Sequence, residues 1–294
     1  MATWNTDNPA VGNQITADIA DIEENLQELH DVITAITNGT LGTTTAADFQ
    51  VDAVSTPAIL LDRARFEWKD ADEIYIHAGA YHHVGDATTG KSQVVYWNTK
   101  LTSDIGSPVV SDWYYLYIDD TAVIELDTNL LTTDQLLWSN TEPAWSEAKH
   151  GWYNGEDKAI FAVLTDGSSN IIEFFHDGDF FQFADLITSL ASADKSSTFT
   201  DNDVTLSAPK FTTQVQVTFD CRYVDATATY SWRTNGQTAS TGHAIGVVTA
   251  ATTNMRNTMR VTTNSSQAIE VKVAGTNTNT IGVYTEGWYF PTGM

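Results

Sequence analysis

In Thr213-Gln-Val-Gln-Val-Thr-Phe219, polar and apolar residues alternate from Gln214 to Phe219. Successive side chains of a β-strand point to opposite faces, so this alternation predicts a strand with one buried and one exposed face. The same pattern returns at 228–232, 243–248, 259–262, 268–273 and 280–284, and the segments between are rich in Thr, Asn and Gly. We therefore predict that residues 200–294 form a β-sandwich of the jelly-roll type.

The preceding segment, residues 43–182, combines strand-like runs with many aromatic residues. The clearest run is Trp113-Tyr-Tyr-Leu-Tyr-Ile118, and similar runs lie at 73–77, 93–97, 159–164 and 170–175. Aromatic and β-branched residues bounded by Gly, Asp and Asn indicate strands joined by turns, so an antiparallel β domain is predicted. Six of the nine tryptophans lie here: Trp68, Trp97, Trp113, Trp138, Trp145 and Trp152. Two interpretations of them stay open: packing in the core and between subunits, or a platform on which sugar rings stack.

The first segment, residues 1–42, contains a heptad seam. Isoleucine and leucine recur with alternating spacings of four and three at Ile15, Ile19, Ile22, Leu26, Leu29, Ile33 and Ile36. A narrow apolar stripe with this period is typical of a coiled coil, and isoleucine at both core positions favours three strands over two. We predict a helix over residues 13–38 that associates with two further copies of itself in parallel. The alternative is a single amphipathic helix that packs on the chain's own β domain.

Between the two β segments, residues 183–199 are predicted to form a helical neck and a linker. Apolar residues follow the i, i+3, i+4, i+7 spacing of a helix with one buried face, at Phe183, Leu186, Ile187 and Leu190. The residues from Ser192 onward are polar and rich in serine, which is typical of a linker. The chain is therefore predicted to have four parts, with boundaries after residues 42, 182 and 199.

Charge is distributed unevenly along the chain. The net charge of the 294 residues is −24, but residues 200–294 carry six acidic and six basic side chains. A strongly negative field repels phosphate groups, so nucleic acid is an unfavourable partner. No apolar stretch reaches the roughly 20 residues that cross a bilayer, so no membrane insertion is expected. The single cysteine, Cys221, excludes an intrachain disulfide and a thiolate zinc site.

The sequence contains no catalytic motif that identifies an enzyme. It lacks the metalloprotease HExxH motif, the GxSxG nucleophile elbow and the phosphate-binding loop. Five histidines would bind a metal only if three of them converged in the fold: His77, His82, His83, His150 and His176. The acidic pairs at 119–120 and 177–179 lack the spacing of a calcium loop. We expect no catalytic residues, no metal and no cofactor, although two carboxylates brought together in space would still suit glycoside hydrolysis.

Three features together resemble bacteriophage fibre or tail-appendage proteins. They are the acidic heptad region, the aromatic β segment with Trp68-Lys-Asp-Ala-Asp-Glu-Ile-Tyr-Ile-His-Ala-Gly79 and Trp113-Tyr-Tyr-Leu-Tyr-Ile-Asp-Asp120, and the neutral last segment that ends in Gly287-Trp-Tyr-Phe-Pro291. The resemblance implies a homotrimer whose N-terminus attaches to other virion proteins and whose distal C-terminal domain meets the host surface. It also implies a location on the virion, at its surface or tail, after assembly in the host cytoplasm.

A trimeric, non-enzymatic virion fibre or spike that binds a host glycan or surface protein is therefore the expected function. The neutral last segment can approach a negatively charged envelope without long-range repulsion, and its polar side chains suit sugar hydroxyls. The receptor-binding residues predicted there are Trp232, Asn235, Asn254, Arg256, Asn277 and Asn279. One alternative is a structural virion component, such as a capsid-surface fibre or a baseplate or tail adaptor, that docks other virion proteins. Another is a glycan-cleaving tailspike enzyme.

Overall fold

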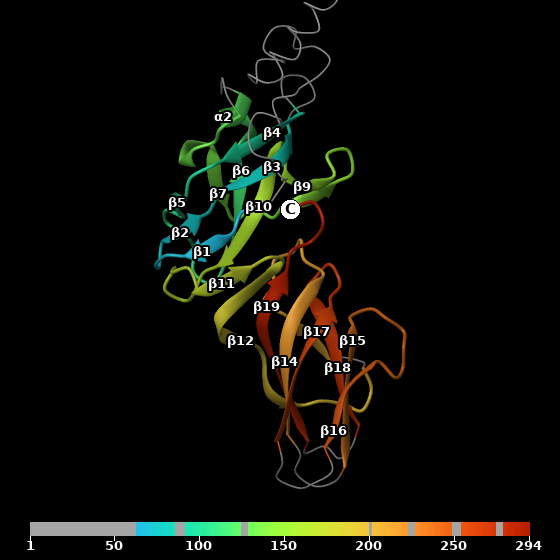
Figure 1. Ribbon diagram of the computed structural model, residues 1–294. Helices are drawn as coiled ribbons and strands as arrows, with labels where there is room; N and C mark the ends of the chain where they lie inside the picture. Colours follow the sequence, from blue (N-terminus) through green and yellow to red (C-terminus); the bar gives the residue numbers. More distant parts are fainter. Residues whose placement is uncertain are drawn as a thin grey trace, which may run out of the picture. The chain divides into compact units, whose positions relative to one another are not determined.

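The computed structural model of the protein describes residues 63–85, 92–124, 129–199, 202–222, 227–248, 254–274 and 279–294 (Figure 1). Leu61–Met294 form one compact unit. The predicted helix at 13–38 and its seam from Ile15 to Ile36 lie outside the described residues, so the coiled coil stays a prediction. In the part that is described, no helix has both the length and the apolar character needed to cross a bilayer.

The described part of the chain is mainly β, as the sequence predicts, and every pairing between its named strands is antiparallel. Its N-terminal strands form three sheets. The first has the order β1-β2-β5, with β1 (Phe66–Trp68), β2 (Glu73–Ile76) and β5 (Leu101–Asp104). The second pairs β3 (Gly79–Val84) with β4 (Ser92–Trp97). The third has the order β7-β6-β10-β9-β8, with β6 (Trp113–Ile118), β7 (Leu136–Ser139), β8 (Ala144–Ser146), β9 (Gly151–Asn154) and β10 (Asp157–Leu164). Two short helical segments, α2 (Asp120–Ile124) and η1 (Thr133–Gln135), lie between β6 and β7 in the chain.

Strands β6 and β10 lie at the centre of the third sheet and are buried along almost their whole length. Tyr115 and Tyr117 of β6 and Phe161 of β10 are completely buried. A continuous apolar run, rather than an alternating one, is the pattern of a strand that is covered on both faces. The aromatic runs of the sequence therefore build the core of this region.

The C-terminal strands form two further sheets whose pairing is nested. One has the order β11-β12-β19-β14-β17, with β11 (Phe174–Asp177), β12 (Phe180–Asp194), β14 (Gln214–Arg222), β17 (Asn254–Thr262) and β19 (Thr280–Tyr289). The other has the order β13-β18-β15-β16, with β13 (Asp203–Thr205), β15 (Ala228–Thr234), β16 (His243–Val248) and β18 (Ala268–Ala274). Strand β12 pairs with β19, β13 with β18, β14 with β17, and β15 with β16. The chain is thus folded back on itself as one long antiparallel hairpin that is divided between two sheets.

The helical neck predicted within residues 183–199 is wrong, because Phe180–Asp194 form the 15-residue strand β12. Its pairing with β19 is irregular, since Gln182 lies opposite Gly287 but Ile187 already lies opposite Thr285. Extra residues of this kind are β-bulges, and they interrupt the period of two along the strand. The apolar spacing of three and four that suggested a helix therefore comes from bulges. The ladder to β19 supplies the backbone hydrogen bonds that a helix would have made internally.

A cluster of aromatic rings crosses the predicted boundary between the two β segments. Phe161 on β10 lies 5.4 Å from Phe174 on β11, measured between ring centroids, and Phe174 lies 4.8 Å from Phe181 on β12. Phe181 in turn stacks on Trp288 of β19 at 5.0 Å, and Phe290 stacks on Phe161 at 6.0 Å. The sheet that contains β19 also includes β11 and β12, so the predicted boundary at 182 lies inside strand β12, whereas residue 199 lies in the connection between β12 and β13.

Candidate ligand-binding groove

The receptor-binding residues predicted from the sequence do not form one cluster. Asn254 and Arg256 are exposed at the beginning of β17, where that strand pairs with the end of β14. Asn279 precedes β19 at the same end of the sheet, but it is buried. Asn235 follows the far end of β15, next to the start of β18. Asn277 lies outside the described residues.

Trp232 is a core residue and does not offer the open face that sugar stacking requires. Only 6% of its surface is exposed, and its ring stacks on His243 with the centroids 4.6 Å apart. A receptor-binding role for Trp232 depended on an exposed ring, and the structure buries that ring instead. Arg256 does face solvent, but its guanidinium lies 3.6 Å from the carboxylate of Asp220.

Two of the five candidate metal-binding histidines are buried side chains that form contacts within the protein. The Nε2 atom of His83 lies 2.8 Å from Asp120 Oδ1, and burial lowers the pKa of His83 in spite of this carboxylate. In His176, Nδ1 accepts a hydrogen bond from the Phe66 amide, and Nε2 donates one to the Gly178 carbonyl, each at 3.0 Å. Burial lowers the pKa of His176 to about 4. Across the described residues, no three His, Cys, Asp or Glu side chains are placed to hold a metal ion.

A hollow of about 430 Å³ lies where the β8–β9 hairpin meets β14, β17, β19 and the segment after β19. We call it the aromatic groove. Its lining residues are Trp145, Trp152, Phe211, Thr212, Thr213, Gln214, Arg260, Tyr289, Phe290, Pro291 and Thr292.

The β8–β9 hairpin positions the two indole rings of the groove. Trp145 and Trp152 are direct cross-strand partners, and their rings meet edge to face with centroids 5.8 Å apart. Trp152 is held in place, because its ring packs 6.1 Å from Phe211 and its Nε1 donates a hydrogen bond to the Thr292 carbonyl at 3.3 Å. Trp145 is 36% exposed, so its ring remains available to a ligand.

Polar side chains surround these rings. The guanidinium of Arg260 lies 3.9 Å from the centroid of the Tyr289 ring, and the Tyr289 hydroxyl donates a hydrogen bond to Gln216 Oε1 at 3.1 Å. The buried Oε1 of Gln214 has no hydrogen-bond partner among the described residues. A buried acceptor without a partner is costly, but this atom lies below the surface of the groove and is not itself a ligand contact.

The composition of the groove suits a hydroxylated ligand. An exposed indole can stack on the C–H face of a sugar ring, while amide, hydroxyl and guanidinium groups bond to its hydroxyls. Hydrolysis of a glycosidic bond usually needs two carboxyl groups on either side of that bond. The residues that line the aromatic groove include no Asp and no Glu.

Sequence reasoning found only part of this site. The density of tryptophans left a platform for sugars open beside packing in the core and between subunits, and Trp145 and Trp152 are members of that set. Gln214, Arg260 and Tyr289 were not predicted, because they come from three strands that meet only in the folded sheet. No short motif connects residues that are so far apart in the chain.

Comparison with known proteins identifies no family for this chain. No family model matches it, and no curated protein matches it. Among solved structures, a chain from a structure of infectious bursal disease virus, Gx strain, is similar over 83% of this chain and 76% of its own length. Their sequence identity is 11% and the TM-score is 0.15, which is too low to support an argument about fold or function.

Proposed function

We propose that this protein is a trimeric, non-enzymatic bacteriophage fibre or spike protein, attached to the virion by its N-terminus and binding the host surface through its C-terminal region. The observation that carries the proposal is the aromatic groove, which combines an exposed indole with amide, hydroxyl and guanidinium groups and has no lining carboxylate. Such a site suits a glycan that is bound and not cleaved.

The strand pairing supports the jelly-roll part of this proposal. Four nested pairs, from β12–β19 outside to β15–β16 inside, are divided between two sheets. A jelly roll consists of eight strands in two sheets, and it forms when a long antiparallel hairpin is rolled up in this way. On this view the last segment is a rigid body, and the aromatic groove lies at one of its ends, against the β8–β9 hairpin.

The surface of β11 and β12 supports assembly into a trimer with two further copies of the chain. Phe175 on β11 is 60% exposed and Leu186 on β12 is 44% exposed. Exposed apolar side chains on two paired strands are available for a subunit contact, without fixing the number of chains. The heptad seam from Ile15 to Ile36 independently favours three chains.

One observation favours the alternative of a structural virion component. Strand β17 is an edge strand of its sheet, and among the described residues no strand pairs with its outer edge. A free strand edge offers backbone donors and acceptors to a strand of another protein. A baseplate, tail or capsid protein that added such a strand would make this chain an adaptor.

The decisive experiment measures binding of the full chain to arrayed bacterial surface glycans and to intact host cells. We compare the wild type with Trp145→Ala and with the control Leu137→Ala, which truncates a residue that is 40% exposed on β7 and does not line the groove. Loss of an aromatic contact at the centre of an interface commonly weakens binding by about tenfold or more. We expect that loss for Trp145→Ala and no change for Leu137→Ala.

Other outcomes point to the alternatives. Equal binding by wild type and Trp145→Ala would remove the aromatic groove from the proposal. Binding to purified virion proteins but not to glycans or cells would favour the adaptor. Release of new reducing ends from a bound polysaccharide would identify a tailspike enzyme.

A further inference from the structure

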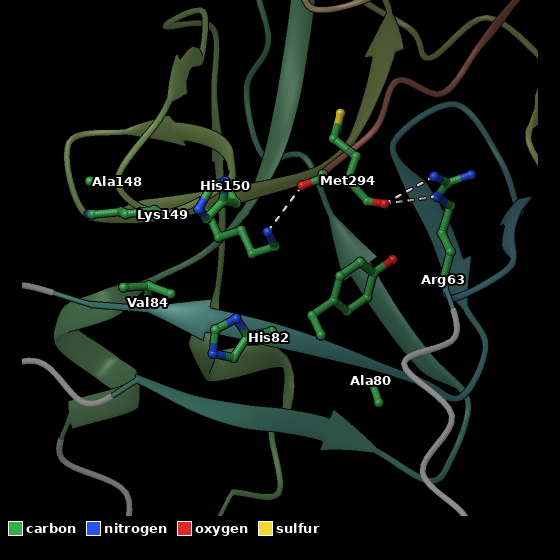
Figure 2. A pocket seen from close by; sticks show the side chains of 11 residues that line it. Arg63, Ala80, His82, Val84, Ala148, Lys149, His150 and Met294 are labelled. Carbon is green, nitrogen blue, oxygen red and sulfur yellow. Dashed lines mark hydrogen bonds between the residues drawn. The ribbon is translucent and has the colours of Figure 1, made fainter.

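A second hollow, of about 420 Å³, lies beside β3 and is rich in basic side chains (Figure 2). We call it the cationic pocket. Its basic members are Arg63, His82, Lys149, His150 and Lys158. Figure 2 shows His82 on one wall, Lys149 and His150 on another, and Arg63 beside Met294 on the far side.

The charge of this pocket contrasts with the charge of the whole chain. The sequence has a net charge of −24, with 38 acidic and only 14 Lys and Arg residues. Three of those scarce cations line the cationic pocket, together with two histidines, and its lining includes no Asp and no Glu. A concave site that gathers one sign of charge focuses the local field and attracts ligands of the opposite sign.

Two of the cations are neutralised by partners of their own. The Arg63 guanidinium forms an ion pair with Asp179 and donates two hydrogen bonds to the main-chain oxygen of Met294. Lys149 forms an ion pair with Glu156. These two side chains shape the walls of the pocket and contribute little net charge to its interior.

Lys158 differs from them, because its charge is buried without a carboxylate partner. Only 6% of its surface is exposed, and it forms no ion pair with any described residue. Its Nζ donates one hydrogen bond, to the Gly293 carbonyl at 3.1 Å, although an ammonium group has three donors. Burial lowers the pKa of Lys158 to about 8, so in most molecules this side chain is still protonated at neutral pH.

The backbone leaves room for this ammonium group. A Cβ atom on Gly151 would lie 2.8 Å from Lys158 Nζ, so a larger residue at 151 would displace it. The Tyr153 ring, whose centroid is 5.1 Å away, gives the charge only partial compensation. The remaining donors of Lys158 therefore lack acceptors at the wall of an open hollow.

We propose that the cationic pocket binds an oxyanion, a carboxylate or phosphate group of a ligand, which pairs with Lys158. The anion accepts hydrogen bonds from the Lys158 ammonium, which has no carboxylate partner among the described residues. A carboxylate is planar with two oxygens, whereas a phosphate has more acceptors and more charge, so the two anions are tested separately. This site is independent of the aromatic groove and of any fibre function.

The test titrates the folded full chain with inorganic phosphate and, separately, with acetate at constant ionic strength, using calorimetry. The variant is Lys158→Met, which keeps most of the side-chain length and removes the charge. The matched control is Lys100→Met, because Lys100 also lies over a tyrosine ring, at 3.6 Å from the Tyr75 centroid, but does not line the pocket.

We expect saturable binding of at least one of the two anions to the wild type and to Lys100→Met. Removal of one member of a buried charge pair commonly weakens binding by about thirtyfold or more, and we expect this for Lys158→Met. Absence of saturable binding of both anions to the wild type, or equal binding by Lys158→Met, would overturn the proposal.

A second measurement covers the case in which Lys158→Met does not fold. Carbon NMR of the Lys158 Cε atom in the wild type follows the titration of this residue with and without anion. A bound anion favours the protonated form, so the pKa should rise from about 8 by about one unit or more. An unchanged pKa at saturating phosphate and acetate would show that the lysine is merely packed against Tyr153.

Discussion

Acidification should destabilise the fold through His176, because this buried imidazole cannot take up a proton without loss of its contacts. Its Nδ1 accepts the Phe66 amide proton at 3.0 Å, and protonation would turn this acceptor into a donor that faces another donor. Burial is the main cause of the low pKa, and the guanidinium groups of Arg63 and Arg65 also disfavour a positive ring. The hydrogen bond from Nε2 to Gly178 offsets only part of this effect.

The sign and size of the effect follow from the two pKa values of His176. Above pH 6.5 the residue is neutral in both the folded and the unfolded chain, so its full contribution to the free energy of unfolding is present. Between pH 6.5 and about 4 only the unfolded chain binds the proton, and the free energy of unfolding falls as the pH falls. The difference between the folded and unfolded pKa values corresponds to about 3 kcal/mol of unfolding free energy, of which about 2 kcal/mol is lost between about pH 7 and pH 5.

The assay is urea unfolding followed by tryptophan fluorescence at several pH values between about 7 and 5. Protein concentration is held constant, because the stability of an oligomer depends on it. The variant His176→Gln removes the titrating group, and His243→Gln is a control at an exposed histidine. Carboxylates and His83 titrate in all three proteins, so their contributions cancel in the comparison.

We expect the wild type and His243→Gln to lose about 2 kcal/mol more than His176→Gln over this pH range. The variant itself will be less stable at neutral pH, which does not affect the comparison of slopes. An identical pH dependence in wild type and His176→Gln would refute the reasoning, because it would mean that His176 titrates normally in the folded protein.

Two further predictions concern close packing and assembly. Gly287→Ala should destabilise the fold by about 3 kcal/mol in urea unfolding, because its Cβ would lie 2.0 Å from the Phe181 carbonyl oxygen. The control Gly167→Ala, whose Cβ would have nothing within 4 Å, should cost much less. Equal effects of the two substitutions would contradict this account of the packing between β12 and β19. Replacement of Ile22 and Leu29 by Asp should reduce the trimer fraction in sedimentation equilibrium, because unpaired charges buried in a seam cost several kcal/mol. An unchanged trimer fraction would show that the seam is not part of the interface.

Local patterns in the sequence were enough to predict most of the strands. The run at 113–118 became β6, and the runs at 159–164 and 268–273 lie within β10 and β18. These strands could be found because side-chain propensity and a period of two, or a continuous apolar run, are properties of neighbouring residues. The coiled coil at 13–38 rests on the same kind of local evidence and stays a prediction.

The sequence by itself determined the mainly β class and the unusual acidity of the chain. Only the tertiary structure decided that 180–194 is a bulged strand, that Trp232 is buried, and that Trp145, Gln214 and Arg260 line one groove. Likewise, only the tertiary structure reveals that Lys158 has no carboxylate beside it among the described residues. The physical reason is that periodicity reports which face of a strand is apolar, whereas bulges, partner strands and buried charges depend on contacts between residues far apart in the chain.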